Sequence, residues 1–294
     1  MELLVSQAFN GIAIGAAYAL LVTGLNLLLL IRRIFQWSFA HIVVLSMCVL
    51  WMVLDNYSGS VVTGIAIASS AAIGTSIALN LVTEPMFRPM VRRGLYMEAF
   101  ILAIGFGIVL TDVMSKYVNH GSPVMFPSYL TGAGSFDVGN FSFSLAKILT
   151  IAISILSMFA LFRFLNRTQY GRSFRAMAQE PYKAALLGIP ITRTGILGFT
   201  VAGIIGGISA ILLSMAIGYA YPALPNILAV KGLAVVLVAG PGNLIGGLIT
   251  AFSLGVAEVM TGTYISGDWM QAIVFSVMLA IILAKPSGIF GARV

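Results

Sequence analysis

Two pairs of oppositely charged residues are the groups in this sequence best placed to do electrostatic chemistry. Asp112 and Lys116 lie four residues apart in one predicted helix, acid first, which is the favourable order for a helical ion pair. We expect a local surface pair there, the alternative being a role in handling a proton or a solute. Lys231 and Glu258 lie in neighbouring apolar segments, where an unpaired charge is costly. We expect them to form an ion pair that locks residues 227–262, the alternatives being separate side chains that reach outward and direct contact with a solute.

Other reactive groups are sparse, and their types argue against an enzyme. His41 and His120 are the only histidines and Cys48 is the only cysteine, so the sequence offers neither a metal-ligand cluster nor a disulfide. None of the five lysines is followed by Ser or Thr, which excludes a Walker A nucleotide-binding loop. His41 is expected to be a hydrogen-bonded structural residue, although the run from Trp37 to His41 could instead line a passage. We therefore predict a chain that is not an enzyme and binds no metal or cofactor itself.

The elements that must position these groups are long apolar segments. Hydrophobic residues make up 60% of the 294 residues and charged residues only 9%, against about 25% charged in soluble domains. A membrane-spanning helix needs about 20 apolar residues. We predict an all-α polytopic membrane protein, a single domain over residues 1–294, with about eight transmembrane segments. The candidate segments are 5–31, 34–54, 61–83, 99–118, 145–165, 195–217, 227–240, 243–262 and 268–284.

Two stretches of the sequence are expected to contain broken or re-entrant helices. Residues 32–42 begin with Arg32 and Arg33, which interrupt two apolar segments. Residues 227–262 contain the turn sequence Gly240-Pro241-Gly242-Asn243, and the segment before that turn is short. Non-helical backbone at membrane depth is tolerated only inside protein or along a watery cavity. The sequence leaves open whether residues 227–262 cross the membrane twice or re-enter.

The distribution of Lys and Arg predicts the orientation in the membrane, because short cytoplasmic loops are enriched in these residues. Residues 119–143 contain neither Lys nor Arg and are assigned to the outside. We expect the N-terminus outside and the C-terminus in the cytoplasm, with Lys231 and Glu258 near the outer ends of their segments. The basic residues assigned to the inside are Arg32, Arg33, Arg88, Arg92, Arg93, Lys285, Arg293 and those of residues 163–193.

One polar island interrupts the apolar sequence at residues 163–193. We expect a helix over residues 172–187 that has Ser173 as its N-cap, is divided by Pro181 and stops at Gly188. Two interpretations stay open: an interfacial loop that only fixes topology, and a docking helix that enters a groove of a cytoplasmic partner. The basic residues of the island are Arg163, Arg167, Arg172, Arg175, Lys183 and Arg193.

Short motifs in a fixed order give nearly the whole chain a resemblance to a known family. They are Phe9-Asn10-Gly11, Gly15 to Leu20, Ser38-Phe39-Ala40-His41, Glu84 with Phe87-Arg88-Pro89, Gly171, Arg175-Ala176, Glu180, Ala184-Ala185, Leu187-Gly188-Ile189, Lys231-Gly232, Gly240 to Gly247, Glu258 and Lys285 to Gly291. Their order and spacing resemble the integral-membrane permease subunits of high-affinity branched-chain amino acid ABC transporters, the LivH type. Ser38 stands where the family pattern has Asn, and Ile42 stands where it has Gly.

The resemblance implies a subunit of the bacterial inner membrane that works with several partners. They are two cytoplasmic ABC ATPases that bind ATP and Mg, a second permease subunit (LivM-like or a second copy), and a periplasmic or lipid-anchored solute-binding protein; membrane lipid surrounds the chain, and nucleic acid is not implied. The ATPases would dock on a coupling loop at about residues 166–194. The implied coupling residues are Gly171, Arg172, Arg175, Ala176, Glu180, Ala184, Ala185 and Gly188, and the implied path residues are Asn10, Tyr18, Ser38 and His41.

The resemblance implies the transport class more sharply than the solute. Related permeases carry branched-chain or other amino acids, urea or short amides, and the departures at Ser38 and Ile42 leave this choice open. We expect branched-chain or other hydrophobic amino acids. The alternatives are urea or short amides in the same importer class, and an ion-coupled secondary carrier, which would need an ion or proton site among few intramembrane acids.

Overall fold

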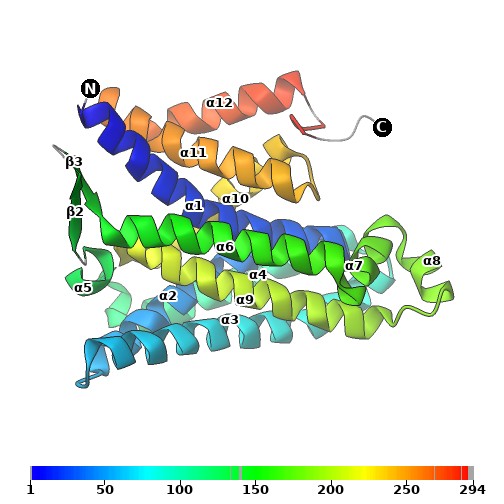
Figure 1. The fold of residues 1–294 in the computed structure, drawn as a ribbon. Helices are drawn as coiled ribbons and strands as arrows, with labels where there is room; N and C mark the ends of the chain where they lie inside the picture. The colour runs from blue at the N-terminus through cyan, green and yellow to red at the C-terminus, as the bar shows by residue number, and fades with distance from the viewer. Residues whose placement is uncertain (1, 133, 139–140, 268, 286, 291–294) are drawn as a thin grey trace.

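The computed structural model describes residues 2–132, 134–138, 141–267, 269–285 and 287–290. Long helices lie side by side between the two ends of the molecule (Figure 1). One end, called here the basic end, carries α7 (Gln169–Gln179) and α8 (Pro181–Leu186), and the other, the hairpin end, carries β2 (Ser135–Val138) and β3 (Phe141–Ser144). The longer helices are α1 (Glu2–Arg32), α2 (Ser38–Asn56), α3 (Val61–Arg92), α4 (Tyr96–Tyr117), α6 (Leu145–Arg167), α9 (Ile191–Ile217), α10 (Leu224–Ala239), α11 (Leu244–Tyr264) and α12 (Met270–Ala284).

Short elements close the hairpin end. The 3-10 turn η1 (Asn119–Gly121), strand β1 (Val124–Met125) and helix α5 (Ser128–Thr131) follow α4. Strand β1 pairs antiparallel with β4 (Tyr219–Ala220), which follows α9, and β2 pairs antiparallel with β3. These pairings satisfy backbone groups of loops that would otherwise be left without partners.

The predicted all-α polytopic architecture is confirmed. Among the described residues, seven helices are long and apolar enough to cross a membrane, namely α1, α2, α3, α4, α6, α9 and α11, while α10 and α12 are shorter apolar helices. The largest difference from prediction is α3, which continues past residue 83 through Pro85 and Pro89 to Arg92. An i,i+4 ion pair between Glu84 and Arg88 supports this extra part of the helix, and apolar periodicity alone does not reveal it.

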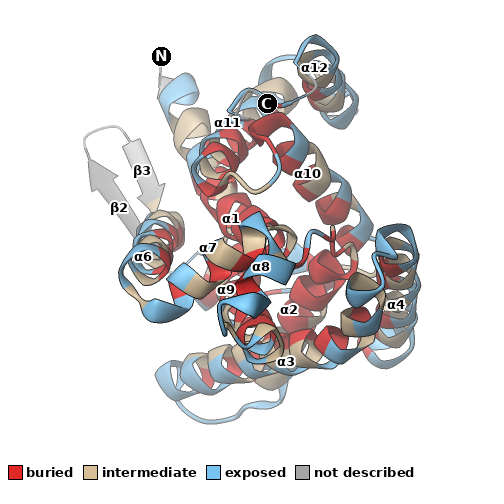
Figure 2. Cartoon of the chain, turned by 90° about the vertical axis from the view of Figure 1, so that its right-hand side faces the viewer, coloured by how far each residue is buried: buried red, intermediate tan, exposed pale blue. Residues whose placement is uncertain are grey.

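Helix α1 forms the centre of the bundle, and most of its surface is covered by protein (Figure 2). Glycines allow its closest contact, with α11. A Cβ atom added at Gly11 would lie 2.7 Å from the Cα of Val256, and one added at Gly15 would lie 2.9 Å from the Cα of Phe252. On the other side, Gly255 has no room for a Cβ because the backbone of Gly15 lies against it. Small residues that let helix backbones touch are a common basis of helix association in lipid.

The chain breaks between α1 and α2, in the stretch where a broken helix was expected. Arg33 has a φ of +57°, which ends α1, and α2 begins only at Ser38. The ring of Phe39 lies against Gly24 of α1 and Gly206 of α9, far from the ends of both helices. Helix α2 therefore starts inside the bundle, which makes the break a re-entrant one.

A second break joins α10 to α11 at residues 240–243, and one buried side chain holds it. The amide of Asn26 donates to the carbonyl of Asn243 at 2.9 Å and accepts from the N–H of Gly242 at 2.8 Å. Asn243 caps α11 by accepting from the N–H of Gly246 and donates to the carbonyl of Phe290 at 2.8 Å. The turn thus keeps its polar groups satisfied without water.

Helix α10 runs obliquely across the bundle rather than along it (Figure 2). Its 16 residues measure about 24 Å at about 1.5 Å per residue, less than the roughly 30 Å of a hydrocarbon core. It starts beside α2, where Asn226 contacts His41, and ends at the turn that Asn26 holds. The oblique course lets a short helix connect α2 with α11 and α12.

The glycine contact between α1 and α11 predicts a site-specific loss of stability. We expect Gly255→Ala to lower the thermal midpoint of the purified chain by several degrees, because the added methyl group forces the two helices apart at a cost of about 1–3 kcal/mol. Gly74→Ala in α3 is the matched control, since nothing lies within 4 Å of its added Cβ; it should leave the midpoint unchanged or raise it. Equal midpoints for the two variants would contradict the contact.

Candidate functional site

The polar island folds as two short helices that project at the basic end (Figure 1). Pro181 divides the island as predicted, since α7 ends at Gln179 and α8 begins at Pro181. The predicted N-cap is wrong: Thr168 caps α7 by accepting from the N–H of Gly171 at 3.1 Å, whereas Ser173 lies inside the helix. The chain turns directly after α6, so the first threonine after that turn takes the cap. We call α7 and α8 together the coupling hairpin.

The predicted coupling residues divide into an inner and an outer group. Gly171 and Ala184 are buried, and a Cβ at Gly171 would overlap the backbone of Leu165, so these two shape the hairpin. Gly188 has a φ of +81°, which a glycine adopts without strain, and it ends α8. Ala176 is half-buried, and the remaining predicted residues, Arg172, Arg175, Glu180 and Ala185, are exposed together with Gly188.

The outer surface of α8 is apolar, which is unusual for a polar end of the molecule. Tyr182, Leu186 and Leu187 are 73%, 71% and 81% exposed. We call these three residues the α8 face. The sequence motifs include Leu187 but neither Leu186 nor Tyr182. Tyr182 lies four residues before Leu186, and this spacing is the signal that would have placed the two side chains on one side of a helix.

Arg33 connects the coupling hairpin to the re-entrant break, a contact that the sequence did not predict. Its guanidinium donates to the carbonyls of Ala178 at 3.0 Å and Gln179 at 2.6 Å. Both acceptors belong to the last turn of α7, where carbonyls lack helical partners and the helix dipole favours a cation. The end of α7 is therefore tied to the residue at which α1 stops.

Other basic residues gather at the same end through contacts of their own. Glu84 is buried and pairs with both Arg32 and Arg88. Arg92 donates to the hydroxyl of Thr192, just after the hairpin, at 2.9 Å. Arg32, Arg33, Arg88 and Arg92, which charge distribution assigned to one side of the membrane, thus lie at one end of the molecule. Arg293 of the same set lies outside the described residues.

The four predicted path residues do not form one site. Asn10 accepts from the ammonium of Lys147 at 2.7 Å near the hairpin end of α1, and Tyr18 lies eight residues further along the same helix. Ser38 and His41 share the first turn of α2, where His41 contacts the amide oxygen of Asn226 at 3.2 Å. The buried hydroxyl of Ser38 has no hydrogen-bond partner among the described residues.

Lys231, Glu258 and Tyr18 form a buried cluster where α10, α11 and α1 meet. Lys231 and Glu258 are in direct ion-pair contact, and Lys231 donates to the hydroxyl of Tyr18 at 3.0 Å. The ammonium also lies 5.0 Å from the centre of the Tyr18 ring, within range of a cation–π interaction. Lys231 lies in the middle of α10, and its position near the outer side of the membrane stays a prediction. We call these three residues the charged cluster.

The second predicted ion pair, between Asp112 and Lys116, lies on the surface. Lys116 and Asp112 are 2.8 Å apart on α4, with side chains 65% and 57% exposed. An exposed helical pair of this type contributes only a few tenths of a kcal/mol. In the described part of the chain, no group of three His, Cys, Asp or Glu residues is arranged to hold a metal ion.

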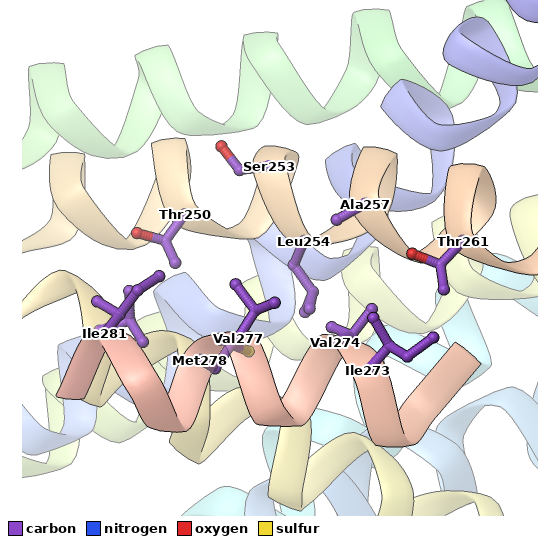
Figure 3. Close-up of a pocket in the computed structure, with 11 residues that line it drawn as sticks. Thr250, Ser253, Leu254, Ala257, Thr261, Ile273, Val274, Val277, Met278 and Ile281 are labelled. Atoms are coloured by element: carbon purple, nitrogen blue, oxygen red, sulfur yellow. The ribbon is translucent and has the colours of Figure 1, made fainter. Parts of the chain in front are cut away.

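Two of the cavities that adjoin α11 differ in character. The cavity between α11 and α12, of about 150 Å³, has no charged residue in its lining (Figure 3). A cleft of about 310 Å³ lies beside the charged cluster and includes Tyr18, Lys231 and Glu258 in its wall. The residues that line the first cavity are Val238, Thr250, Ser253, Leu254, Ala257, Thr261, Ile273, Val274, Val277, Met278 and Ile281.

Helices long enough to span a membrane, with breaks inside the bundle, are typical of the membrane subunits of transporters. The comparison with known families specifies which one. Residues 7–283 match the family described as the permease component of the branched-chain amino acid transport system, and the chain belongs to that family.

Curated relatives match the chain over nearly its whole length. It is 26% identical to the high-affinity branched-chain amino acid transport system permease protein LivH of Escherichia coli (strain K12), over 97% of this chain and 94% of the relative. It is 23% identical to the corresponding protein BraD of Pseudomonas aeruginosa, over 97% and 95%. A probable LivH of Methanocaldococcus jannaschii is 22% identical over 72% and 70%. The chain is thus a permease subunit of an ABC importer, a multi-pass inner-membrane protein and not an enzyme.

The charged cluster predicts strong energetic coupling between its two ions. We expect Lys231→Met and Glu258→Gln each to destabilise the chain by about 3–5 kcal/mol, because each leaves a buried charge without its partner. The double variant should lose less than the sum of the single losses, and a double-mutant cycle in denaturant-unfolding experiments measures the difference. Additive losses would show that the two side chains are independent.

Proposed function

We propose that this permease imports amino acids with apolar side chains, driven by ATPase subunits that bind the coupling hairpin. The observation that carries the proposal is the α8 face, an exposed apolar surface on a projection that Arg33 ties to the re-entrant break. The named relatives that serve branched-chain amino acids support the solute class. No Walker A pattern occurs in the sequence, so ATP and Mg would be bound by the partner chains.

The α8 face suits a protein partner better than lipid or water. Its tyrosine and two leucines offer the kind of large apolar side chains that fill a groove at the centre of an interface. Charged residues surround it, among them the ion pair of Lys183 with Glu180 at 2.7 Å, and would set the register of docking. A groove on each of two cytoplasmic ATPases would take one such hairpin.

Arg33 would transmit the movement of the hairpin into the membrane. When an ATPase moves α7, the last carbonyls of α7 would pull or release Arg33 and with it the start of the re-entrant break. The break leads within five residues to Ser38 and then to His41, whose contact with Asn226 reaches α10. In this proposal, movement of the coupling region at 166–194 is transmitted through Arg33 to the predicted path residues of α2.

The basic end would face the cytoplasm, because Lys and Arg concentrate there and the hairpin end has few such residues. The N-terminus would then be outside and the C-terminus inside. We propose that the whole of residues 1–294 acts as one permease domain. A second permease, either a LivM-like chain or another copy, would complete the path, and a periplasmic or lipid-anchored binding protein would deliver the solute at the hairpin end.

The α8 face provides the first test of this function. In proteoliposomes that contain the assembled importer, we expect uptake of L-leucine that requires ATP and the binding protein. Leu187→Asp should reduce both ATPase co-purification and uptake at least tenfold, because it places a charge in the centre of an apolar contact. Uptake without ATP, or uptake of urea and not of L-leucine, would contradict the proposal.

A matched control separates docking from membrane insertion. Val62→Asp changes a side chain that is 79% exposed, against 81% for Leu187, at the opposite end of the molecule. It should leave ATPase co-purification unchanged. If both variants lose the ATPases equally, the loss reflects poor folding and the α8 face is not the docking surface.

The contact of Arg33 provides the second test. We expect Arg33→Ala to leave ATPase binding intact and ATP hydrolysis within about twofold of the original rate. Uptake of L-leucine per ATP should fall at least fivefold, because movement of α7 would no longer be passed to the start of α2. Arg93→Ala is the control, because Arg93 is exposed at the same end and its removal should change neither rate. Equal effects of both substitutions would show that only positive charge matters at this end.

A further inference from the structure

The charged cluster is paired but not fully satisfied. Glu258 is only 7% exposed. Its Oε1 atom contacts Lys231, while its buried Oε2 atom has no hydrogen-bond partner in the part of the chain that the structure describes. A buried carboxylate oxygen without a partner costs free energy, and such groups in native proteins call for an explanation. An ion pair that served only to lock two helices would be expected to have both oxygens satisfied.

The cleft beside the cluster has the size and lining of a small-molecule site. Its volume of about 310 Å³ lies at the lower end of the range of ligand pockets, about 300–1,000 Å³. Tyr219 and Tyr221 stack on each other in its wall, with ring centroids 6.0 Å apart, and Tyr219 is 44% exposed. Leu228 and Met270 supply apolar surface next to them. The cleft therefore combines an aromatic and apolar wall with one acid and one base.

We propose that this cleft binds the backbone end of a zwitterionic α-amino acid during transport. The free Oε2 atom of Glu258 would accept from the ammonium of the solute. The ammonium of Lys231 and the hydroxyl of Tyr18 would donate to its carboxylate, and the apolar wall would receive its side chain. This inference rests on the proposed import function and specifies the part of the path that recognises the solute.

The charge balance of the cluster selects this class of solute. Lys231 and Glu258 together carry no net charge, so a zwitterion can exchange one internal ion pair for two external ones without leaving a buried charge alone. A simple amine would satisfy Glu258 and leave Lys231 unpaired, and a simple carboxylate would do the reverse; each error is expensive in a desolvated site. Urea and short amides carry no charges and would not compensate for opening the internal pair.

A charge-swapped variant distinguishes this role from a structural one. Lys231→Glu combined with Glu258→Lys restores an ion pair between α10 and α11 but reverses its polarity, so a bound amino acid would point its side chain away from the apolar wall. In the assembled importer, at saturating binding protein, we expect this variant to hydrolyse ATP normally while its maximal L-leucine uptake falls at least tenfold. Uptake at the original level would overturn the inference and leave the pair a structural lock.

Two further variants keep the test decisive. Where the swapped chain fails to assemble with its ATPases, Glu258→Asp replaces it: this variant keeps the charge but withdraws the carboxylate by one methylene group, and unchanged maximal L-leucine uptake would overturn the inference. The control is the swap of the exposed pair, Asp112→Lys with Lys116→Asp, which should preserve uptake. If the original chain recruits no ATPases, the proposed function fails; if it does, and the swapped variant imports L-leucine normally, only the amino acid site fails.

Discussion

In lipid, every backbone N–H and C=O that leaves a helix must find its partner within the protein, because no water can replace it. This constraint explains why the two breaks in the bundle lie where polar side chains can reach them. Asn26 satisfies two backbone groups of the turn at 240–243, and Arg33, at the end of α1, donates to the last carbonyls of α7.

Much of the fold follows from local sequence, since apolar runs of spanning length leave few alternatives in a membrane. The nine predicted segments correspond to nine helices, and Pro181 divides the coupling hairpin because proline cannot continue a helix from within. The contact of Lys231 with Glu258 was also expected, because a charge in an apolar segment requires a partner and few candidates exist. The lengths of the helices, the residues that interrupt them and the pairing of buried charges can thus be predicted from a single sequence.

Two kinds of feature could not be predicted: contacts between residues that are far apart in the chain, and the direction in which a helix crosses the bundle. Arg33 and its acceptors are about 145 residues apart, and the acceptors are backbone carbonyls, which every residue has and no pattern reveals. The oblique course of α10 across the bundle (Figure 2) has no signal in the sequence either. The resemblance grouped Asn10 and Tyr18 with Ser38 and His41, but the first two lie on α1, the last two lie on α2, and their polar partners differ.

The balance of charge in the charged cluster has a consequence for the energy source of transport. A charge that crosses the membrane potential exchanges about 2.3 kcal/mol with it per 100 mV. Lys231 and Glu258 lie in contact and sum to zero, so any displacement that moves them together does almost no electrical work. The charged cluster itself therefore adds almost nothing to any dependence of transport on the membrane voltage.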